Sequence, residues 1–355
     1  MDCSQKRNRF HLWQLVCHLQ ARLRAPIPGH SDTQTEIGLS SESKPIVAIV
    51  GSSSKQGRSV ARSLLRSGRY HVRALTGRID SPEALRLAEQ GAELVAVPLA
   101  IGHKKDFVKA FEGAHGAFLM TPGVMPPATY EFDIGKELAD AAVEAGVQHV
   151  VFSALENVDK ITGGTKFAPH FTDKGRVEAY IRGLPILSSF IELAFFFTNL
   201  LEYYTPRMDG DTLVFPVYLP EHFHAPFVDP LTATGPAVLE IFDHPHTYAG
   251  QTLPVIGDVI SPAEMIETFM RVTGQKAVYA SAYKSEELIH HFPDFAENQE
   301  LVREIIGMAE FSVQYGYFRK DRDLEWSRRI NSGSLGWEQF LRATGWDGQR
   351  KAFGL

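Results

Sequence analysis

Short apolar runs alternate with amphipathic stretches from Pro45 to about residue 192. Runs such as "IVAIV" and "HVVFSA" span about four to eight residues and are rich in β-branched side chains, which predicts buried strands. Between them, apolar positions recur at helical spacing and predict helices over 56–67, 82–90, 104–112 and 129–145. Strands that alternate with helices form βαβ units, and right-handed crossovers cover both faces of a parallel sheet. We therefore expect a doubly wound α/β fold.

The pattern becomes irregular after about residue 192. Asp229-Pro230 and Ser261-Pro262 mark helix starts, and the remaining third is mostly helical and rich in aromatic residues. We expect a sheet domain over 45–192 and a smaller, mostly helical substrate or lid domain over 193–355. Some segments of the smaller domain are expected to return to the sheet.

Residues 1–44 differ from the rest of the chain. They contain no acid between Asp2 and Asp32, and several apolar residues in this stretch share one helical face. This pattern weakly resembles a mitochondrial transit segment over 1–24, and the alternative is an extension without a targeting role. Residues 27–44, rich in Ser, Thr, Gly and Pro, predict a flexible linker.

Composition indicates an ordinary soluble protein, with 44% hydrophobic and 22% charged residues. The net charge of -6 argues against direct nucleic-acid binding, which needs a basic excess. No apolar run is long enough to cross a bilayer. Both cysteines precede Pro45, which leaves no disulfide framework in the predicted domains and favours a reducing compartment. We expect a cytoplasmic monomer or homodimer that binds a small molecule or a protein partner.

The first predicted strand runs into a glycine-spaced loop, "GSSSKQG" (residues 51–57). Its first glycine permits a tight turn, and its last permits the helix to pack closely against the strand. A pyrophosphate would lie at the helix N-terminus, where free N–H groups and the helix dipole favour anions. Dinucleotide-binding loops usually carry a middle glycine, and here Ser54 either crowds the phosphate or donates a hydrogen bond to it. The residues expected to bind the nucleotide are Gly51, Ser53, Ser54, Gln56 and Gly57.

The loop after the second predicted strand indicates which nucleotide binds. A site for NAD(H) would place an acid about 20 residues beyond the glycines, where it would bond the ribose hydroxyls. Here the chain has Arg78, with Arg73 nearby, and a guanidinium suits the 2′-phosphate of NADP(H). Asp80 leaves NAD(H) as the alternative cofactor, and a solvated loop charge is the alternative role of Arg78.

Several stretches make the chain resemble the NmrA-like family, an atypical branch of the short-chain dehydrogenase/reductase superfamily. They are "GSSSKQGRSVARSLLRSG", "VVFSALENVDKITGG", "PHFTDKGRVEAYIRGLPI", "LAFFFTNLL" and "DLEWSRRINSGSLGWEQFL". The resemblance covers nearly everything after residue 45. The quoted stretches look more like the NADP(H)-sensing, redox-sensor branch of the family than like its isoflavone-reductase-like branch. It implies a Rossmann domain, a small C-terminal domain, and NADP(H) with its 2′-phosphate near Arg78. The family usually has its arginine directly after the threonine, whereas Gly77 separates Thr76 from Arg78 here.

The resemblance also points to residues 170–174. Typical short-chain dehydrogenases use Tyr-x-x-x-Lys, in which the tyrosine transfers a proton and the lysine holds the ribose. None of the 11 tyrosines here has a lysine four residues on, but His170 and Lys174 would share a helix face. Lys174 is expected to hold the ribose and is also a candidate general acid, as in isoflavone-reductase-like relatives. His170 can move a proton near neutral pH, and the alternative is a cofactor site that reduces nothing.

Ser153 and Thr121 are candidate site residues because they lie at the ends of the fifth and fourth predicted strands. Superfamily members place a catalytic serine or threonine where Ser153 lies, and the alternative is a strand-end cap. Thr121, with Pro122, is expected to line the nicotinamide side of the cleft. The His-x-His pairs at 222–224 and 244–246 have spacing that a metal could use, but no third ligand is evident in the sequence, so we expect no metal.

Two functions fit these features. The first is an NADPH-dependent reductase of a small, apolar carbonyl or enone compound in specialised metabolism, which His170, Lys174 and the aromatic residues favour. The second is a catalytically silent NADP(H) redox sensor that acts through protein partners, which the missing tyrosine favours. The acidic net charge and the lack of a helix-turn-helix pattern argue against a DNA-binding regulator.

Overall fold

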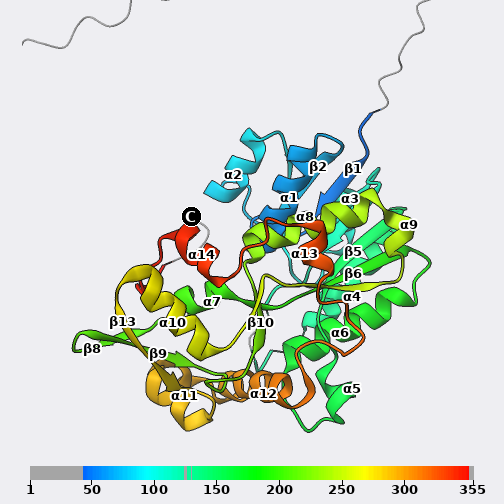
Figure 1. Ribbon diagram of the computed structural model, residues 1–355. Coiled ribbons are helices and arrows are strands. Elements are labelled where there is room, and N and C mark those ends of the chain that lie inside the picture. The colour runs from blue at the N-terminus through cyan, green and yellow to red at the C-terminus, as the bar shows by residue number, and fades with distance from the viewer. Residues whose placement is uncertain (1–42, 124–125, 129, 352–355) are drawn as a thin grey trace, which may run out of the picture. The chain divides into compact units, whose positions relative to one another are not determined.

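Seven parallel strands form the central sheet, in the order β11-β6-β5-β4-β1-β2-β3. Figure 1 shows β1 beside β2 and β5 beside β6 in this sheet. The computed structural model describes residues 43–123, 126–128 and 130–351, so the predicted targeting segment lies outside the described residues. The order reverses between β1 and β4, and ligands of open parallel sheets bind at the carboxyl ends of the strands at such a point. The strands are β1 (Ile46–Ile49), β2 (His71–Thr76), β3 (Glu93–Ala96), β4 (Gly116–Leu119), β5 (His149–Ala154), β6 (Leu187–Leu193) and β11 (Thr252–Val255).

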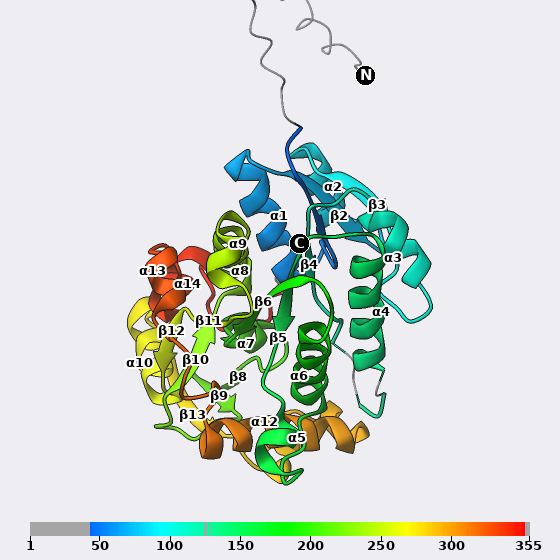
Figure 2. The same ribbon diagram turned by 90° about the vertical axis from the view of Figure 1, so that its right-hand side faces the viewer.

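Helices cover both faces of this sheet, which confirms the doubly wound fold (Figure 2). Side chains alternate along β1: Val47 and Ile49 are buried on the face of α1 and α8, whereas Ala48 and Val50 are buried on the face of α3, α4 and α6. The flanking helices are α1 (Lys55–Ser67), α2 (Pro82–Glu89), α3 (Lys104–Phe111), α4 (Glu131–Glu144), α5 (Val158–Thr162), α6 (Pro169–Arg182) and α8 (Pro230–Asp243).

Helices α1 and α8 pack at very short range on their shared face of the sheet. The backbone N–H of Gly235 donates to Ser59 Oγ at 2.9 Å, and a Cβ atom on Gly235 would lie 2.1 Å from the Ser59 carbonyl oxygen. A larger residue at position 235 would therefore push the two helices apart. This contact fixes α1, and with it the loop that precedes α1, against the C-terminal half of the chain.

The chain after β6 is mostly helical, as predicted, and also forms two small sheets, β12-β10-β7 and β13-β9-β8. Strand β11 returns from residue 252 to the central sheet beside β6, and residues 44–355 form one compact unit. No helix in the described part of the chain is long and apolar enough to cross a membrane. The remaining elements are β7 (Phe195–Phe196), α7 (Phe197–Glu202), β8 (Arg207–Asp209), β9 (Thr212–Val217), β10 (Ala225–Val228), α9 (Pro245–Tyr248), β12 (Asp258–Ile260), α10 (Pro262–Thr273), β13 (Lys276–Ser281), α11 (Ser285–His291), a 3₁₀ turn (Pro293–Glu297), α12 (Gln299–Tyr315), α13 (Trp326–Ile330) and α14 (Trp337–Thr344).

A buried histidine begins β5. His149 is 2% exposed, and its Nε2 lies 3.0 Å from Ser189 Oγ, which donates in turn to the carbonyl oxygen of Tyr248. Nδ1 of His149 has no hydrogen-bond partner among the described residues. Burial, and then the nearby charges of His115 and His246, lower the pKa of His149 to about 4. His149 is therefore neutral in the folded protein at pH 7.

Stability is expected to fall in mild acid because of His149. Its pKa drops from 6.5 to about 4 on folding, so the unfolded chain binds the proton first as the pH falls. The free energy of unfolding should decrease by roughly 3 kcal/mol as the pH falls through this window. Urea denaturation of the wild type and of His149→Gln, at about pH 7 and about pH 4, measures this contribution. An equal loss in both proteins would show that His149 is not the cause.

Candidate functional site

The loop between β1 and α1 folds tightly against the sheet. Gly51 has a φ of +65°, a conformation that favours glycine, and Ser52 Oγ donates to the carbonyl oxygen of Leu75 on β2. A Cβ atom on Gly57 would lie 2.2 Å from the Gly51 carbonyl oxygen, so α1 can begin this close to the strand only with glycine there. The structural roles predicted for Gly51 and Gly57 are thus confirmed.

Ser54 replaces the usual middle glycine without strain. Its φ of -73° and ψ of 169° are extended values that any residue adopts. Ser54 is the N-cap of α1: its Oγ accepts from the N–H of Gly57 at 3.0 Å and donates to Met120 Sδ at 3.2 Å. Its neighbour Ser53 shares a hydrogen bond of 2.9 Å with Thr76 Oγ1 at the end of β2. In this structure the Ser54 side chain therefore stabilises the helix start that a phosphate would face.

A cavity of about 260 Å³ lies beside this loop, at the carboxyl ends of β1, β2, β3 and β4. Most of its lining is apolar, which suits a flat heterocyclic base such as adenine. The cavity occupies the crevice at the point where the strand order reverses, as the fold predicts. Its lining residues are Val50, Gly51, Ser53, Ser54, Leu75, Thr76, Gly77, Val97, Leu99, Phe107, Met120, Pro122 and Gly123.

The two arginines near the end of β2 lie in different surroundings. Arg78 is exposed just beyond the cavity residue Gly77, and its backbone N–H donates to Thr76 Oγ1 at 3.3 Å. Arg73 instead pairs with Glu93 at 2.9 Å and donates to the carbonyl oxygens of Ala110 and Glu112. Arg73 therefore connects β2 to β3 and to the end of α3. Of the two arginines, Arg78 is the exposed one, and its guanidinium is accessible to a phosphate.

Lys174 lies in a buried polar network between β4, α4 and α6. Its Nζ donates to Thr121 Oγ1 at 2.9 Å and is ion-paired with Glu131 Oε1, and Thr121 Oγ1 donates to the same carboxylate oxygen at 2.5 Å. The side chains of Lys174 and Glu131 are 13% and 2% exposed. The predicted pair Lys174 and Thr121 is therefore brought together, with a carboxylate that the sequence did not indicate.

Ser153 connects β5 to the nucleotide loop. Its Oγ donates to Gln56 Oε1 at 2.8 Å, and Gln56 lies in the first turn of α1. Ser153 is buried, at 4% exposure. Ser153 and Gln56, predicted from distant parts of the sequence, thus lie in contact at the carboxyl edge of the sheet.

His170 lies one helical turn before Lys174 on α6, and a second buried carboxylate contacts it. Its Nδ1 and its backbone N–H both contact Glu304 Oε1, the backbone bond being 3.1 Å long. Glu304 comes from α12, more than a hundred residues later in the chain. An acid on an amphipathic helix resembles an ordinary solvated charge, so the sequence carried no signal for it.

A cluster of aromatic residues packs between α6 and the C-terminal region. Phe195 and Phe197 are buried in the core, and the Tyr317 ring packs edge-on against Phe171 and Phe195. Tyr204 is buried, at 9% exposure, and burial raises its pKa well above the usual range, so its phenol is a poor proton donor at pH 7. This aromatic cluster therefore does not supply an acid at pH 7.

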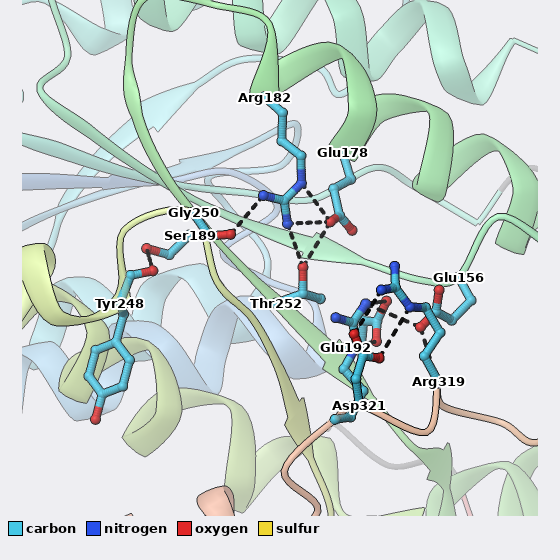
Figure 3. Close-up of polar contacts among 11 residues, drawn as sticks. Glu156, Glu178, Arg182, Ser189, Glu192, Tyr248, Gly250, Thr252, Arg319 and Asp321 are labelled. Carbon is cyan, nitrogen blue, oxygen red and sulfur yellow. Dashed lines mark hydrogen bonds and ion pairs between the residues drawn. The ribbon is translucent and has the colours of Figure 1, made fainter.

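A strap of residues 316–325 links α12 to α13 and crosses the carboxyl ends of β5 and β6. Arg322, in the strap, donates from Nε to Glu192 Oε2 and from Nη2 to Glu156 Oε1, both at 3.1 Å. The strap backbone also contributes, because the N–H of Arg319 donates to Glu156 Oε1 at 3.2 Å (Figure 3). Both carboxyl groups thus contact one guanidinium, and burial, and then the charge of Glu156, raise the pKa of Glu192 to about 8, so that Glu192 is largely protonated at pH 7.

The paired histidines lie apart from this site. His222 and His224 contact Glu221 and Glu264, and His244 contacts Glu240. No group of three or more His, Cys, Asp or Glu residues suitable for a metal ion occurs within the described ranges.

Comparison with known proteins places these features in a family. A model of the NmrA-like family matches residues 43–341. The NmrA-like family domain-containing oxidoreductase malD of Malbranchea aurantiaca is 34% identical over 256 residues, covering 66% of this chain and 75% of malD. The nitrogen metabolite repression protein nmrA of Emericella nidulans is 28% identical over 280 residues, covering 75% and 76% of the two chains.

A solved structure shows the same fold. The structure of NmrA, a negative transcriptional regulator, in complex with NADP superimposes with a TM-score of 0.68 at 25% identity. The match covers 86% of this chain and 98% of NmrA. The central sheet, its flanking helices and the helical C-terminal region therefore recur in a Rossmann-type protein of known structure. The chain belongs to the NmrA-like family.

Proposed function

We propose that the chain is an NADP(H)-dependent oxidoreductase that reduces a small, apolar carbonyl or enone compound. The observation that carries this proposal is the convergence of loop 51–57, Ser153 and the Lys174–Glu131–Thr121 network at the carboxyl edge of the sheet. The similarity to malD, which is named an oxidoreductase, and to NmrA, whose structure holds NADP, supports it. The cytoplasmic location and a role in specialised metabolism stay predictions.

The residues present fit NADP(H). The apolar cavity would take the adenine, and the close approach of Gly57 to Gly51 lets α1 begin beside the end of β1, where its first turn would face a pyrophosphate. Ser54 Oγ would turn from Met120 to the phosphate, and Arg78 would pair with the 2′-phosphate. Each contact uses a group that already lies at the cavity or beside it.

Lys174 would hold the cofactor ribose, and its neighbours would orient it. An ammonium group has three N–H donors, and Lys174 directs two of them to Thr121 and Glu131. One donor remains for a ribose hydroxyl. Because Lys174 is held in this way, we assign the proton-donor role to His170, one turn earlier on the same helix.

The nicotinamide, when bound, would supply a hydride to the carbonyl carbon of the substrate. His170 would donate a proton to the carbonyl oxygen, and Ser153 would donate a hydrogen bond to that oxygen after leaving Gln56. The buried aromatic side chains Phe171, Phe195 and Tyr317 would keep water from the reacting atoms.

The test of this function is turnover. Purified protein with NADPH is mixed with a panel of apolar ketones, aldehydes, enones and quinones, and the near-ultraviolet absorbance of NADPH is followed. Oxidation of NADPH that requires both protein and one class of compound supports the proposal. Tight binding of NADPH with no oxidation by any compound would contradict it.

A redox sensor is the second candidate, and a specific observation favours it. Lys174 is already neutralised by buried Glu131, and none of the 11 tyrosines precedes a lysine by four residues. The relative nmrA is named a nitrogen metabolite repression protein, which supports a regulatory role for this chain too. The sensor predicts that NADP⁺ and NADPH bind with different affinities and change the hydrogen exchange of surface segments, without turnover.

Arg78 is expected to set the preference for NADP(H) over NAD(H). A charge-assisted hydrogen bond contributes about 1.5–3 kcal/mol, so Arg78→Ala should weaken NADP⁺ binding by roughly 10- to 100-fold. NAD⁺ lacks the 2′-phosphate, and its affinity should not change. Isothermal titration calorimetry of both nucleotides measures the difference. Arg69→Ala, which removes an exposed arginine paired with Asp243 beyond α1, is the matched control. Equal losses for both nucleotides would exclude a 2′-phosphate contact.

A further inference from the structure

One oxygen of Glu304 accepts two contacts from His170. Glu304 lies in the second turn of α12, and its side chain is 6% exposed. Its Oε1 accepts from the backbone N–H of His170 at 3.1 Å and also contacts His170 Nδ1. The N–H groups of the first helical turn have no acceptor within their own helix. Because Ala168, the N-cap of α6, has no side-chain oxygen, Glu304 caps α6 from another part of the chain.

The position of Glu304 is fixed by close packing of α12 on the segment that leads into α6. A Cβ atom on Gly307 would lie 2.1 Å from the Phe167 carbonyl oxygen, so the two backbones touch. On the turns to either side, the Arg303 guanidinium lies 4.3 Å from the centre of the Phe167 ring, and Lys166 pairs with Glu310 at 2.7 Å. One face of α12 thus packs against residues 166–170, and Glu304 lies on this face.

This geometry determines which ring nitrogen of His170 carries hydrogen. A carboxylate only accepts hydrogen bonds, so Nδ1 must be the donor to Glu304, and Nε2 becomes the nitrogen that gains and loses the proton. The ring is also held edge-on at 4.7 Å from Phe171. Ionisable side chains around this contact include Lys174, one turn later on α6, the Lys166–Glu310 pair, Arg303, and the buried Tyr204, on which the charge of Glu304 acts.

We propose that Glu304 is the positioning residue of His170: it fixes the Nδ1–H tautomer and leaves Nε2 as the proton donor. The catalytic use of Nε2 rests on the proposed function. In that reaction a carbonyl compound and NADPH give an alcohol and NADP⁺. Hydride goes to carbon, the Nε2 proton goes to oxygen, and the imidazolium becomes neutral imidazole. Glu304 contacts none of the reacting atoms and acts only through His170.

The tautomer is tested directly by nitrogen NMR of the full chain labelled with ¹⁵N-histidine, without cofactor or substrate. His170 signals are assigned by their absence in His170→Ala. We expect the Nδ1–H form in the wild type above the pH at which the ring is charged, its loss in Glu304→Ala, and its return in Glu304→Gln, whose amide oxygen also accepts. An Nε2–H tautomer in the wild type, or no change in Glu304→Ala, would overturn the proposal.

The catalytic part is tested by a double-mutant cycle. Glu304→Ala should lower kcat by roughly 10- to 100-fold with little change in the Kd of NADPH, since proton transfer of this kind contributes about 10²–10⁴-fold. In the His170→Ala background the same change should have no further effect on kcat. If the losses of kcat in the two single variants multiply in the double variant, Glu304 does not act through His170. Glu300→Ala, which removes an exposed glutamate from the first turn of α12, is the control and should retain wild-type kcat.

These measurements distinguish a failure of the proposed function from a failure of the role assigned to Glu304. If the wild type does not oxidise NADPH with any compound of the panel, the proposed function fails. The NMR result alone then decides whether Glu304 sets the tautomer. If the wild type turns over but the tautomer or the cycle disagrees, the proposed function stands and the assignment of Glu304 fails.

Discussion

Replacing Lys174 by methionine is expected to abolish NADPH oxidation and to weaken NADPH binding by roughly 10- to 100-fold. The variant loses the donor that we assign to the ribose, a charge-assisted hydrogen bond that contributes about 1.5–3 kcal/mol. It also leaves the carboxylate of Glu131, which is 2% exposed, without its cation. Breaking such a buried pair typically costs about 3–5 kcal/mol, so Lys174→Met alone should also be less stable.

The double variant Lys174→Met/Glu131→Gln separates binding from folding. The glutamine is neutral and can still accept from Thr121, so stability should return toward that of the wild type. Turnover and nucleotide affinity should stay low, because the cation is still missing. Lys136→Met, which removes a lysine paired with Asp140 on the surface of α4, is the control and should change neither property. Wild-type turnover in the double variant would exclude a role for Lys174.

Replacing Arg322 by methionine is expected to destabilise the protein by about 3–5 kcal/mol. Arg322 is the cation shared by Glu156 and Glu192, whose side chains are 7% and 1% exposed, and the variant would leave both carboxyl groups buried without it. The strap that carries Arg322 begins at the end of α12, so loss of this anchor should also loosen the contact of Glu304 with His170. Guanidinium denaturation measures the first effect, and hydrogen exchange of the His170 amide, which donates to Glu304, measures the second.

Two further variants distinguish a lost ion pair from a general loss of packing. Arg319→Ala removes an arginine of the same strap whose partner, Asp321, is exposed, and it should cost at most about 1 kcal/mol. Adding Glu156→Gln and Glu192→Gln to Arg322→Met replaces both buried acids by neutral amides and should restore much of the lost stability. If this triple variant is as unstable as Arg322→Met, the charge cluster does not explain the effect.

Most of the sheet could be predicted because its signals are local. The helix predicted over 56–67 is observed at Lys55–Ser67, and that over 104–112 at Lys104–Phe111. The two Pro-containing helix starts were also right: Asp229 Oδ1 accepts from the N–H of Leu231, and Ser261 forms a reciprocal cap with Glu264. Apolar periodicity and capping residues determine such elements without reference to the rest of the chain.

Long-range pairing and buried carboxylates could not be predicted in the same way. Strand β11 has four residues and pairs with β6, which ends nearly sixty residues earlier, so no local pattern marks it as part of the central sheet. Glu131 lies in the first turn of α4, where an acid is already explained by the helix dipole. Glu304 and Arg322 likewise resemble surface charges until the fold brings their partners to them. The buried charges that contact Lys174 and His170 were therefore not predicted, whereas Gly51, Ser53 and Ser54, which line the cavity, were predicted from the loop pattern.

The central claim is that the bound nucleotide is consumed and not merely sensed. Transfer of deuterium from NADPH labelled at C4 of the nicotinamide tests it most directly, because mass spectrometry of the product reports the hydride itself. We expect one deuterium at the former carbonyl or enone carbon, from one face of the nicotinamide only, and none with Lys174→Met/Glu131→Gln. Tight binding of NADPH without transfer of deuterium to any compound of the panel would contradict it and would leave the sensor as the function of this chain.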